Sequence, residues 1–269
     1  MKKFLLMVSF LIPYIAFPIE NHLAGARSRA LSDAFVSISD VWSTFHNQSG
    51  IAGWEHFTAG FYYESRYMVD ELSLAAGSLI IPINRGNFGI SFYQFGKEVY
   101  KENKYALAYA IKLSAKFTAA IQLDYFTQRL PENDRSKGFA TFETGIIYQP
   151  VKMFFLGAHI FNPVKSGIET LQGTEKMPAI FRFGGHYKFE EMVIVAVEVQ
   201  KNSDAKAIIK SGIEFSPGKK LALRLGVSGK PLNYTAGIGY TIGKLTTDIS
   251  FGYHGNLGIT PAVSIQFVM

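Results

Sequence analysis

Apolar and polar residues alternate along most of this chain. Between residues 232 and 242, Leu, Tyr, Ala, Ile, Tyr and Ile occupy every second position, with Asn, Thr, Gly, Gly and Thr between them. Successive side chains of a β-strand point to opposite faces, so this pattern predicts a strand with one apolar and one polar face. The pattern recurs in fourteen segments: 56–64, 71–82, 87–95, 103–113, 116–128, 139–149, 152–161, 179–189, 191–200, 206–215, 219–228, 232–242, 244–253 and 258–268.

The lengths and faces of these segments favour a barrel that spans a membrane. Most segments have 9 to 13 residues, and a tilted strand needs about 9–11 residues to cross the hydrocarbon layer. In 219–228, Leu221, Leu223 and Leu225 oppose Lys220 and Arg224. A charge facing lipid at mid-membrane costs about 2–4 kcal/mol, so the charged faces are expected to point inward. The sequence therefore predicts an all-β fold, a transmembrane antiparallel β-barrel of about 14 strands.

The links between the segments alternate in length. Links 129–138 and 162–178 are long and polar, whereas 83–86, 114–115 and 243 are short. Membrane barrels have short periplasmic turns and longer external loops. The alternation therefore predicts that both chain termini lie in the periplasm.

A soluble β-sandwich or a lipocalin-like barrel is the alternative, because its strands also alternate, with their apolar faces around a core. Two features favour the membrane barrel instead. The polar faces consist mainly of Gly, Ala, Ser and Thr, unlike a solvated surface, and aromatic residues gather near the ends of the segments, as in an interfacial girdle. The girdle residues are Trp54, Phe61, Tyr63, Tyr125, Tyr148, Tyr187, Tyr240 and Tyr253.

The composition agrees with this interpretation and excludes several functions. Charged residues are only 18% of the chain and aromatic residues reach 14%, a composition that favours strands and lipid interfaces. No cysteine is present, which rules out disulfides, thiolate metal sites and a lipid anchor on an N-terminal cysteine. The net charge of +6 is too small and too scattered to indicate nucleic-acid binding.

The N-terminus predicts export. Lys2 and Lys3 precede an almost wholly apolar run over 4–17, which is typical of a secretory signal cleaved near residues 16–20. A membrane-anchor helix is the alternative, but the run is shorter than the ~20 residues that span a bilayer, and Pro13 interrupts it. We therefore divide the chain into a signal peptide (1–19), an N-terminal plug segment (20–55) and a barrel (56–269), placed among the lipids of a Gram-negative outer membrane.

The segment 20–55 lacks the two-residue period and is rich in Ala, Ser, Arg and Asp. It contains Gly25-Ala26-Arg27, Ala34-Phe35-Val36, Asp40 and the box Asn47-Gln48-Ser49-Gly50-Ile51. These motifs resemble the N-terminal region of the PorV/PorQ family, within the broader FadL-like outer-membrane barrels. The family box reads Asn-Pro-Ala-Gly-Leu, so Gln and Ser replace its Pro and Ala here.

The resemblance implies a fourteen-stranded barrel whose N-terminal segment folds into the lumen as a plug. It also implies a host of the Bacteroidota kind and a role in type IX protein secretion, whereas the FadL branch passes hydrophobic molecules through the plug and sideways through the wall. The expected plug residues match these motifs or lie beside them: Gly25, Arg27, Asp33, Asp40, Asn47 and Gly50.

Charged residues on the inward faces are expected near mid-barrel depth, where they must be paired or hydrated. They are Asp124, Glu143, Arg182, Lys210, Arg224 and Asp248. Two interpretations remain open: a structural ion network that fills the lumen, or a functional role as a polar pathway or as a latch for the plug.

Catalysis is not predicted. His159, His186, His254, Asp248 and Ser250 are expected to point inward, but a nucleophile, a base and an orienting group must converge within hydrogen-bond distance. No spacing in the sequence indicates such convergence, a metal site, a cofactor or a phosphate-binding loop.

Two functions follow as hypotheses. The first is a plugged barrel that docks secretion proteins, which the short external links favour. The second is a FadL-like transporter for small hydrophobic compounds, whose wall would open at a kink formed by Gly89 and Gly96 around the third strand. An open general porin is disfavoured by the plug-like segment.

Overall fold

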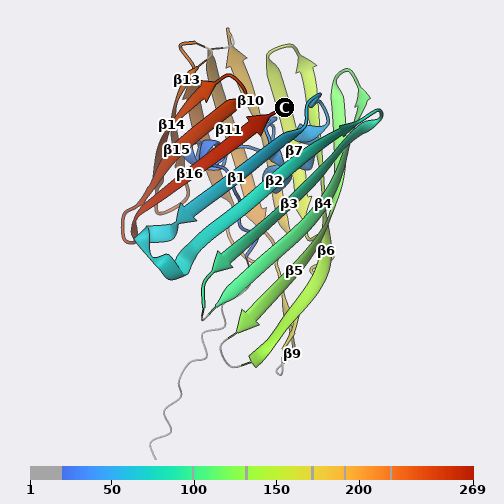
Figure 1. The fold of residues 1–269 in the computed structure, drawn as a ribbon, viewed down its shortest axis with the longest axis vertical. Coiled ribbons are helices and arrows are strands. Elements are labelled where there is room, and N and C mark those ends of the chain that lie inside the picture. Colours follow the sequence, from blue (N-terminus) through green and yellow to red (C-terminus); the bar gives the residue numbers. More distant parts are fainter. Residues whose placement is uncertain (1–19, 99, 131–132, 171–172, 191, 219) are drawn as a thin grey trace, which may run out of the picture.

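Fourteen antiparallel strands close into a barrel in the computed structural model, which describes residues 20–269 except 99, 131–132, 171–172, 191 and 219 (Figure 1). The predicted signal peptide lies outside the described residues. The strands of the wall are β1 (Thr58–Ser65), β2 (Ser73–Ile83), β3 (Gly86–Gly96), β4 (Lys101–Ser114), β5 (Phe117–Leu130), β6 (Asn133–Val151), β7 (Phe154–Phe161), β10 (Ile180–Phe189), β11 (Val193–Asn202), β12 (Ile208–Phe215), β13 (Leu221–Ser228), β14 (Asn233–Ile242), β15 (Leu245–His254) and β16 (Gly258–Val268).

Each wall strand pairs with its neighbours along the chain, and β1 pairs with β16 to close the barrel. The alternation of apolar and polar residues thus predicted the fold class, the strand number and nearly every strand boundary correctly. Closure leaves no unpaired strand edge, as a lipid environment requires. No helix among the described residues is long and apolar enough to cross a membrane.

One predicted loop is instead part of the sheet. The polar link expected at 129–138 continues the ladder of β5 and β6, with Thr127 opposite Gly138 and Leu130 opposite Asn133. Backbone pairing needs no apolar face once a hairpin extends beyond the lipid, which is why the sequence pattern ended too early. The link after β7 holds a second, two-stranded sheet of β8 (Gly167–Thr170) and β9 (Gly173–Lys176).

The outer surface of the barrel is apolar. Phe61, Leu123 and Leu225 expose 64%, 63% and 61% of their surface on three different strands. The predicted girdle residues other than Trp54 are likewise exposed. Trp54 is half-buried and packs against the core, and its carbonyl accepts a hydrogen bond from the Asn87 amide at 2.8 Å.

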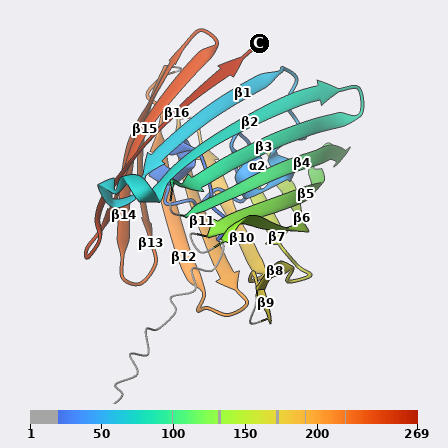
Figure 2. The ribbon, with the colours of Figure 1, turned by 60° about the horizontal axis from the view of Figure 1, so that its bottom comes forward.

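The N-terminal segment, residues 20–57, runs through the inside of the barrel (Figure 2). It contains α1 (Ala26–Ala30), α2 (Ser43–His46) and η1 (Gln48–Ile51). Two further short helices, η2 (Arg66–Met68) and η3 (Asp70–Leu72), lie between β1 and β2. We call the end of the barrel that carries the link 66–72 the loop end, and the end that carries the link 84–85 the turn end.

The two ends of the described chain lie at opposite ends of the barrel, so the prediction that both termini lie in the periplasm gains no support from the structure. His22 bonds to Glu102 near the loop end of β4, at 3.0 Å. At the turn end, the amide of Met269 donates to the carbonyl of Phe57 at 2.9 Å, just before β1 begins. Link lengths indicate only the side on which each strand begins and ends. The N-terminal segment crosses the barrel without forming a strand, so the link lengths carry no information about where it begins.

The exposed position of Leu225 generates a test of the lipid-facing surface. Replacing Leu225, near the middle of β13, with Arg should lower the free energy of unfolding in lipid vesicles by about 2–4 kcal/mol. Leu245→Arg, at the turn end of β15, should cost only about 0–1 kcal/mol, because a charge near the interface stays hydrated. Urea titration of both variants measures the difference, and an equal cost at the two positions would contradict a membrane-spanning band.

Candidate functional site: the filled lumen

Glycines on the inward faces of eight strands make room for the N-terminal segment. A Cβ atom placed on any of them would lie 3.0 Å or less from an atom of that segment. We call this set the glycine ring: Gly60, Gly89, Gly145, Gly157, Gly184, Gly212, Gly226 and Gly237. Glycine in a strand costs stability unless another backbone must approach closely, and here one does.

The tightest contacts of the glycine ring lie on β6 and β7. A Cβ on Gly145 would lie 2.0 Å from Oδ1 of Asn47, and one on Gly157 would lie 2.3 Å from the carbonyl oxygen of Val36. Side chains larger than hydrogen therefore cannot occupy these positions without moving residues 36–47 away from the wall. Sequence reasoning treated inward glycines as general strand composition and missed this role.

Asn47 fastens the segment to the wall. Its amide nitrogen donates to the carbonyls of Val36 at 2.7 Å, Ile146 at 3.1 Å and Ala158 at 3.4 Å. Its Oδ1 accepts from the amide and hydroxyl of Ser49. The side chain thus ties two parts of the segment to β6 and β7, and an anchoring role for Asn47 stays a prediction.

A carboxylate from β11 holds the middle of the segment. Oε2 of Glu198 accepts from the backbone N–H groups of Phe35 and Val36, both at 2.9 Å, and Oε1 lies 3.3 Å from Nζ of Lys210. Lys210 also reaches the carbonyl of Asp33 at 3.4 Å. Buried N–H groups and charges are costly unless paired, so these contacts favour the segment in this place.

Arg27 begins an ion network in the turn-end half of the lumen. Its guanidinium donates to Asp40 at 2.8 Å and to both oxygens of Glu214 at 2.7 and 2.8 Å. Arg224 binds the same Glu214 at 2.5 Å and Asp248 at 2.6 Å. The five groups alternate in sign, so the segment and three strands share one network.

The expected motif glycines are required by the shape of the segment. Gly25 has φ +118°, and a Cβ there would lie 2.6 Å from the Trp42 ring. A Cβ on Gly50 would lie 2.6 Å from Oγ of Ser43. Among the described residues, Asp33 forms no ion pair with a strand residue. It pairs with Arg29 at 3.1 Å within the segment, and Arg29 also contacts Glu64 of β1 at 3.2 Å.

A second network lies between β4 and β7. Lys104 is fully buried and contacts Asp124 at 3.3 Å and Glu143 at a short distance. Oε2 of Glu143 also accepts hydrogen bonds from Nε2 of His159 and from the Gln48 amide of the segment, both at 2.9 Å. Asp124, Glu143 and His159 were expected on inward faces. Gln48, which replaces the proline of the resembled motif, was not expected to bond to the wall.

Arg182 completes the predicted lumen charges. It donates to the carbonyl of His46 at 3.2 Å, at the end of α2. Burial lowers the pKa of His46 to about 4, so this imidazole is neutral at neutral pH. The structure therefore places all six predicted lumen charges against partners, and the interpretation as an ion network that fills the lumen fits these contacts.

The residues considered for catalysis do not come together. His159 bonds to Glu143, His186 bonds to Ser37 at 2.9 Å, and Asp248 bonds to Arg224. Among the described residues, no group of three His, Cys, Asp or Glu side chains is arranged to hold a metal ion.

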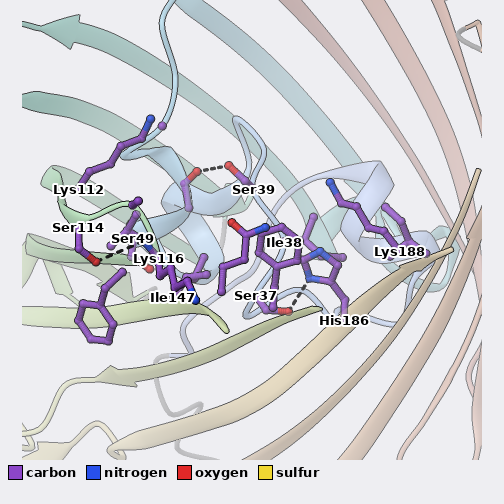
Figure 3. Close-up of a pocket in the computed structure, with 18 of the residues that line it drawn as sticks. Ser37, Ile38, Ser39, Ser49, Lys112, Ser114, Lys116, Ile147, His186 and Lys188 are labelled. Atoms are coloured by element: carbon purple, nitrogen blue, oxygen red, sulfur yellow. Dashed lines mark hydrogen bonds between the residues drawn. The ribbon is translucent and has the colours of Figure 1, made fainter. Parts of the chain in front are cut away.

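A cavity of about 290 Å³ lies at the turn end, between the segment and the inward faces of β4 to β11 (Figure 3). We call it the mouth cavity. Ser37, Ile38 and Gly50 of the segment line one side, and Lys112 and His186 belong to the wall.

A larger cavity, of about 660 Å³, lies over the outside of β6, β7, β10 and β11. We call it the wall groove. Ile146, Ile160, Phe181, Phe183 and Val199 give it an apolar surface. The wall groove lies over the stretch of β6 and β7 to which Asn47 bonds from the inside. Ile146 and Ala158 line the groove, and their carbonyls accept hydrogen bonds from Asn47.

The third strand shows no opening. β3 pairs residue by residue with β2 from Gly86 to Phe95 and with β4 from Asn87 to Gly96. Gly89 faces Ile51 of the segment, and Gly96 lies at the strand end with φ +81°. The proposed kink at these glycines is therefore absent from the structure.

Several solved structures are similar to this barrel in fold. The toluene transporter TbuX of Ralstonia pickettii has a TM-score of 0.69 at 12% identity, covering 91% of this chain and 98% of its own. The toluene transporter TodX of P. putida has 0.70 at 13%, covering 92% and 99%. A FadL homologue of Pseudomonas aeruginosa has 0.68 at 10%, covering 93% and 99%. The chain shares its fold with these proteins.

The FadL-like part of the resemblance is thus confirmed for the fold, whereas the PorV/PorQ assignment gains no support. No protein-family model and no curated sequence matches the chain.

The glycine ring generates a matched pair of variants. Gly157→Val should push residues 36–37 off the wall, since its Cβ would meet the Val36 carbonyl at 2.3 Å. Gly252→Val is the control, because Gly252 also faces inward but its nearest neighbour would be 3.8 Å away. Limited proteolysis should cleave the N-terminal segment only in the Gly157 variant. Equal resistance of the two variants would show that close packing does not hold the segment.

Proposed function

We propose that this chain is an outer-membrane barrel of a Gram-negative bacterium that passes small hydrophobic compounds, with residues 20–57 as its plug and residues 1–19 as its export signal. We place the turn end, which carries the short link 84–85, on the periplasmic side of the membrane. The proposal draws on the apolar outer surface, on the filled lumen and on the shared fold with TbuX and TodX, both described as toluene transporters.

The observation that carries the proposal is the wall groove. A hydrophobic compound dissolved in the membrane finds an apolar depression there. Behind it, the wall is thin in side chains, since Gly145 has none and Ala158 has only a methyl group. Asn47 occupies the inner side and bonds to the backbone of both strands. Movement of Asn47 would remove its hydrogen bonds to these carbonyls, and opening would then also require the ladder between β6 and β7 to break.

The polar lumen makes a sideways route physically reasonable. The ion networks around Glu143 and Arg27 fill much of the interior, and an uncharged apolar molecule gains nothing by displacing paired charges. A short path between the wall groove and the space around the segment avoids most of them. We therefore place the passage at β6–β7 rather than at β3.

A docking role in protein secretion was the first hypothesis that the sequence suggested, and it gains no support from the comparisons. None of the structural relatives named above is described as a secretion protein. Among the described residues, no surface feature favours it over transport, so transport takes precedence.

The absence of cysteine makes a direct test possible. Thr144 and Ile160 are directly opposed on β6 and β7 and both line the wall groove. A Thr144→Cys/Ile160→Cys disulfide should lock this part of the wall and abolish toluene uptake by vesicles that contain the protein. Reduction should restore the uptake.

The matched control locks a distant part of the barrel. Ile249 and Val263 are opposed on β15 and β16, and both are exposed. An Ile249→Cys/Val263→Cys disulfide should leave toluene uptake unchanged. If the Thr144→Cys/Ile160→Cys disulfide left toluene uptake undiminished, the β6–β7 route would be refuted. If the unmodified protein took up no toluene, transport itself would be refuted.

A further inference from the structure

Arg182 differs from the other buried cations of the lumen. It is 3% exposed, yet it forms no ion pair with any described residue. Its Nη1 donates to the carbonyl of His46 at 3.2 Å, and its buried Nε has no hydrogen-bond partner among the described residues. A buried charge without an opposite charge is costly, so stability does not explain this arginine. The cations of the ion networks, by contrast, each contact a carboxylate: Arg27, Arg29, Lys104, Lys210 and Arg224.

Arg182 lies at the inner end of the proposed route. It is directly opposite His159 of β7, and His159 is directly opposite Gly145 of β6. These three inward positions form one row across β6, β7 and β10, at the level where Gly145 makes room for Asn47. Arg182 and His159 also belong to the lining of the wall groove. A compound that crosses from the wall groove between β6 and β7 therefore reaches this row.

The hydrogen bond of Arg182 couples it to the plug. The carbonyl that it binds belongs to His46, the residue before Asn47 at the end of α2. A displacement of Asn47, which the proposed route requires, would also withdraw this carbonyl. Arg182 would then lose the one hydrogen bond that it forms with a described residue, and its guanidinium could contact the compound that passes.

The compounds that reach Arg182 by this route are uncharged, because a charged group is costly to place in the hydrocarbon of a membrane. A hydrocarbon offers a cation only one attractive feature, the negative face of an aromatic ring. A saturated compound of the same size offers none. The contact is strongest when the cation has already lost its water, and burial has removed water from Arg182.

We propose that Arg182 makes the passage selective for aromatic over saturated compounds, through a cation–π contact with the ring once Asn47 has moved. This inference rests on the proposed function and names the residue that sets its substrate class. Arg182 is thus a specificity-determining residue, whereas Asn47 holds the route closed.

Toluene and methylcyclohexane form the test pair, since they share their carbon skeleton and differ in the aromatic ring. Their uptake by vesicles that contain the protein is measured and corrected for uptake by protein-free vesicles. The intact protein should take up toluene about ten-fold faster, which corresponds to about 1.4 kcal/mol. Arg182→Met removes the charge and should bring the two rates close to each other, and Arg182→Lys should restore part of the difference.

Arg224→Met is the matched control, because Arg224 is also a buried arginine but lies on β13 and binds Glu214, away from β6 and β7. It should leave the ratio of the two uptake rates unchanged. Retarded migration of the unheated protein in SDS gels shows that each variant is folded. An unchanged ratio in Arg182→Met would overturn the inference and leave transport intact. If neither compound entered faster than in protein-free vesicles, transport would be refuted, and this inference with it.

The intact protein offers a second test that needs no variant. Fluorine withdraws electrons from an aromatic ring, so the ring face of hexafluorobenzene is positive, whereas that of benzene is negative. A cation–π contact predicts that benzene is taken up about ten-fold faster than hexafluorobenzene after the same correction. Equal uptake of these two compounds would overturn the role of Arg182 even if Arg182→Met failed to fold.

Discussion

A barrel of fourteen strands is too wide for its own side chains to fill, and the rest of this structure depends on how that space is occupied. About eight strands give an interior that inward side chains just fill. Here a separate segment of the chain fills the lumen, and the glycine ring lets its backbone approach the wall. Close packing of backbone on backbone then allows Asn47 and Glu198 to make hydrogen bonds that longer inward side chains would block.

The charges inside the barrel follow from the same arrangement. Buried ions contribute little net stability even when paired, but an unpaired one costs several kcal/mol. Arg27 of the segment gives Glu214 of the wall a cationic partner, and Gln48 of the segment donates a hydrogen bond to Glu143 of the wall. The segment and the wall are thus each incomplete without the other, which gives the segment one preferred position.

The sequence predicted the wall well because each strand separates lipid from a polar interior, and this separation imposes a two-residue period. The period fails where a strand leaves the lipid, so the ladder between Gln128 and Lys137 was taken for a loop. The inward charges were predictable from strand parity, whereas their partners were not. The course of the segment depends on contacts between residues far apart in the chain, such as Val36 with Gly157, and no local pattern encodes them. Its start at the loop end was therefore missed.

The central claim is that residues 20–57 close the barrel. Single-channel conductance in a planar bilayer tests it most directly, by comparing the intact protein with a variant that lacks residues 20–50. The account predicts that the intact barrel conducts almost no ions and that the shortened one forms a stable open pore. Ready conductance of the intact protein, or a shortened barrel that inserts and stays closed, would contradict it.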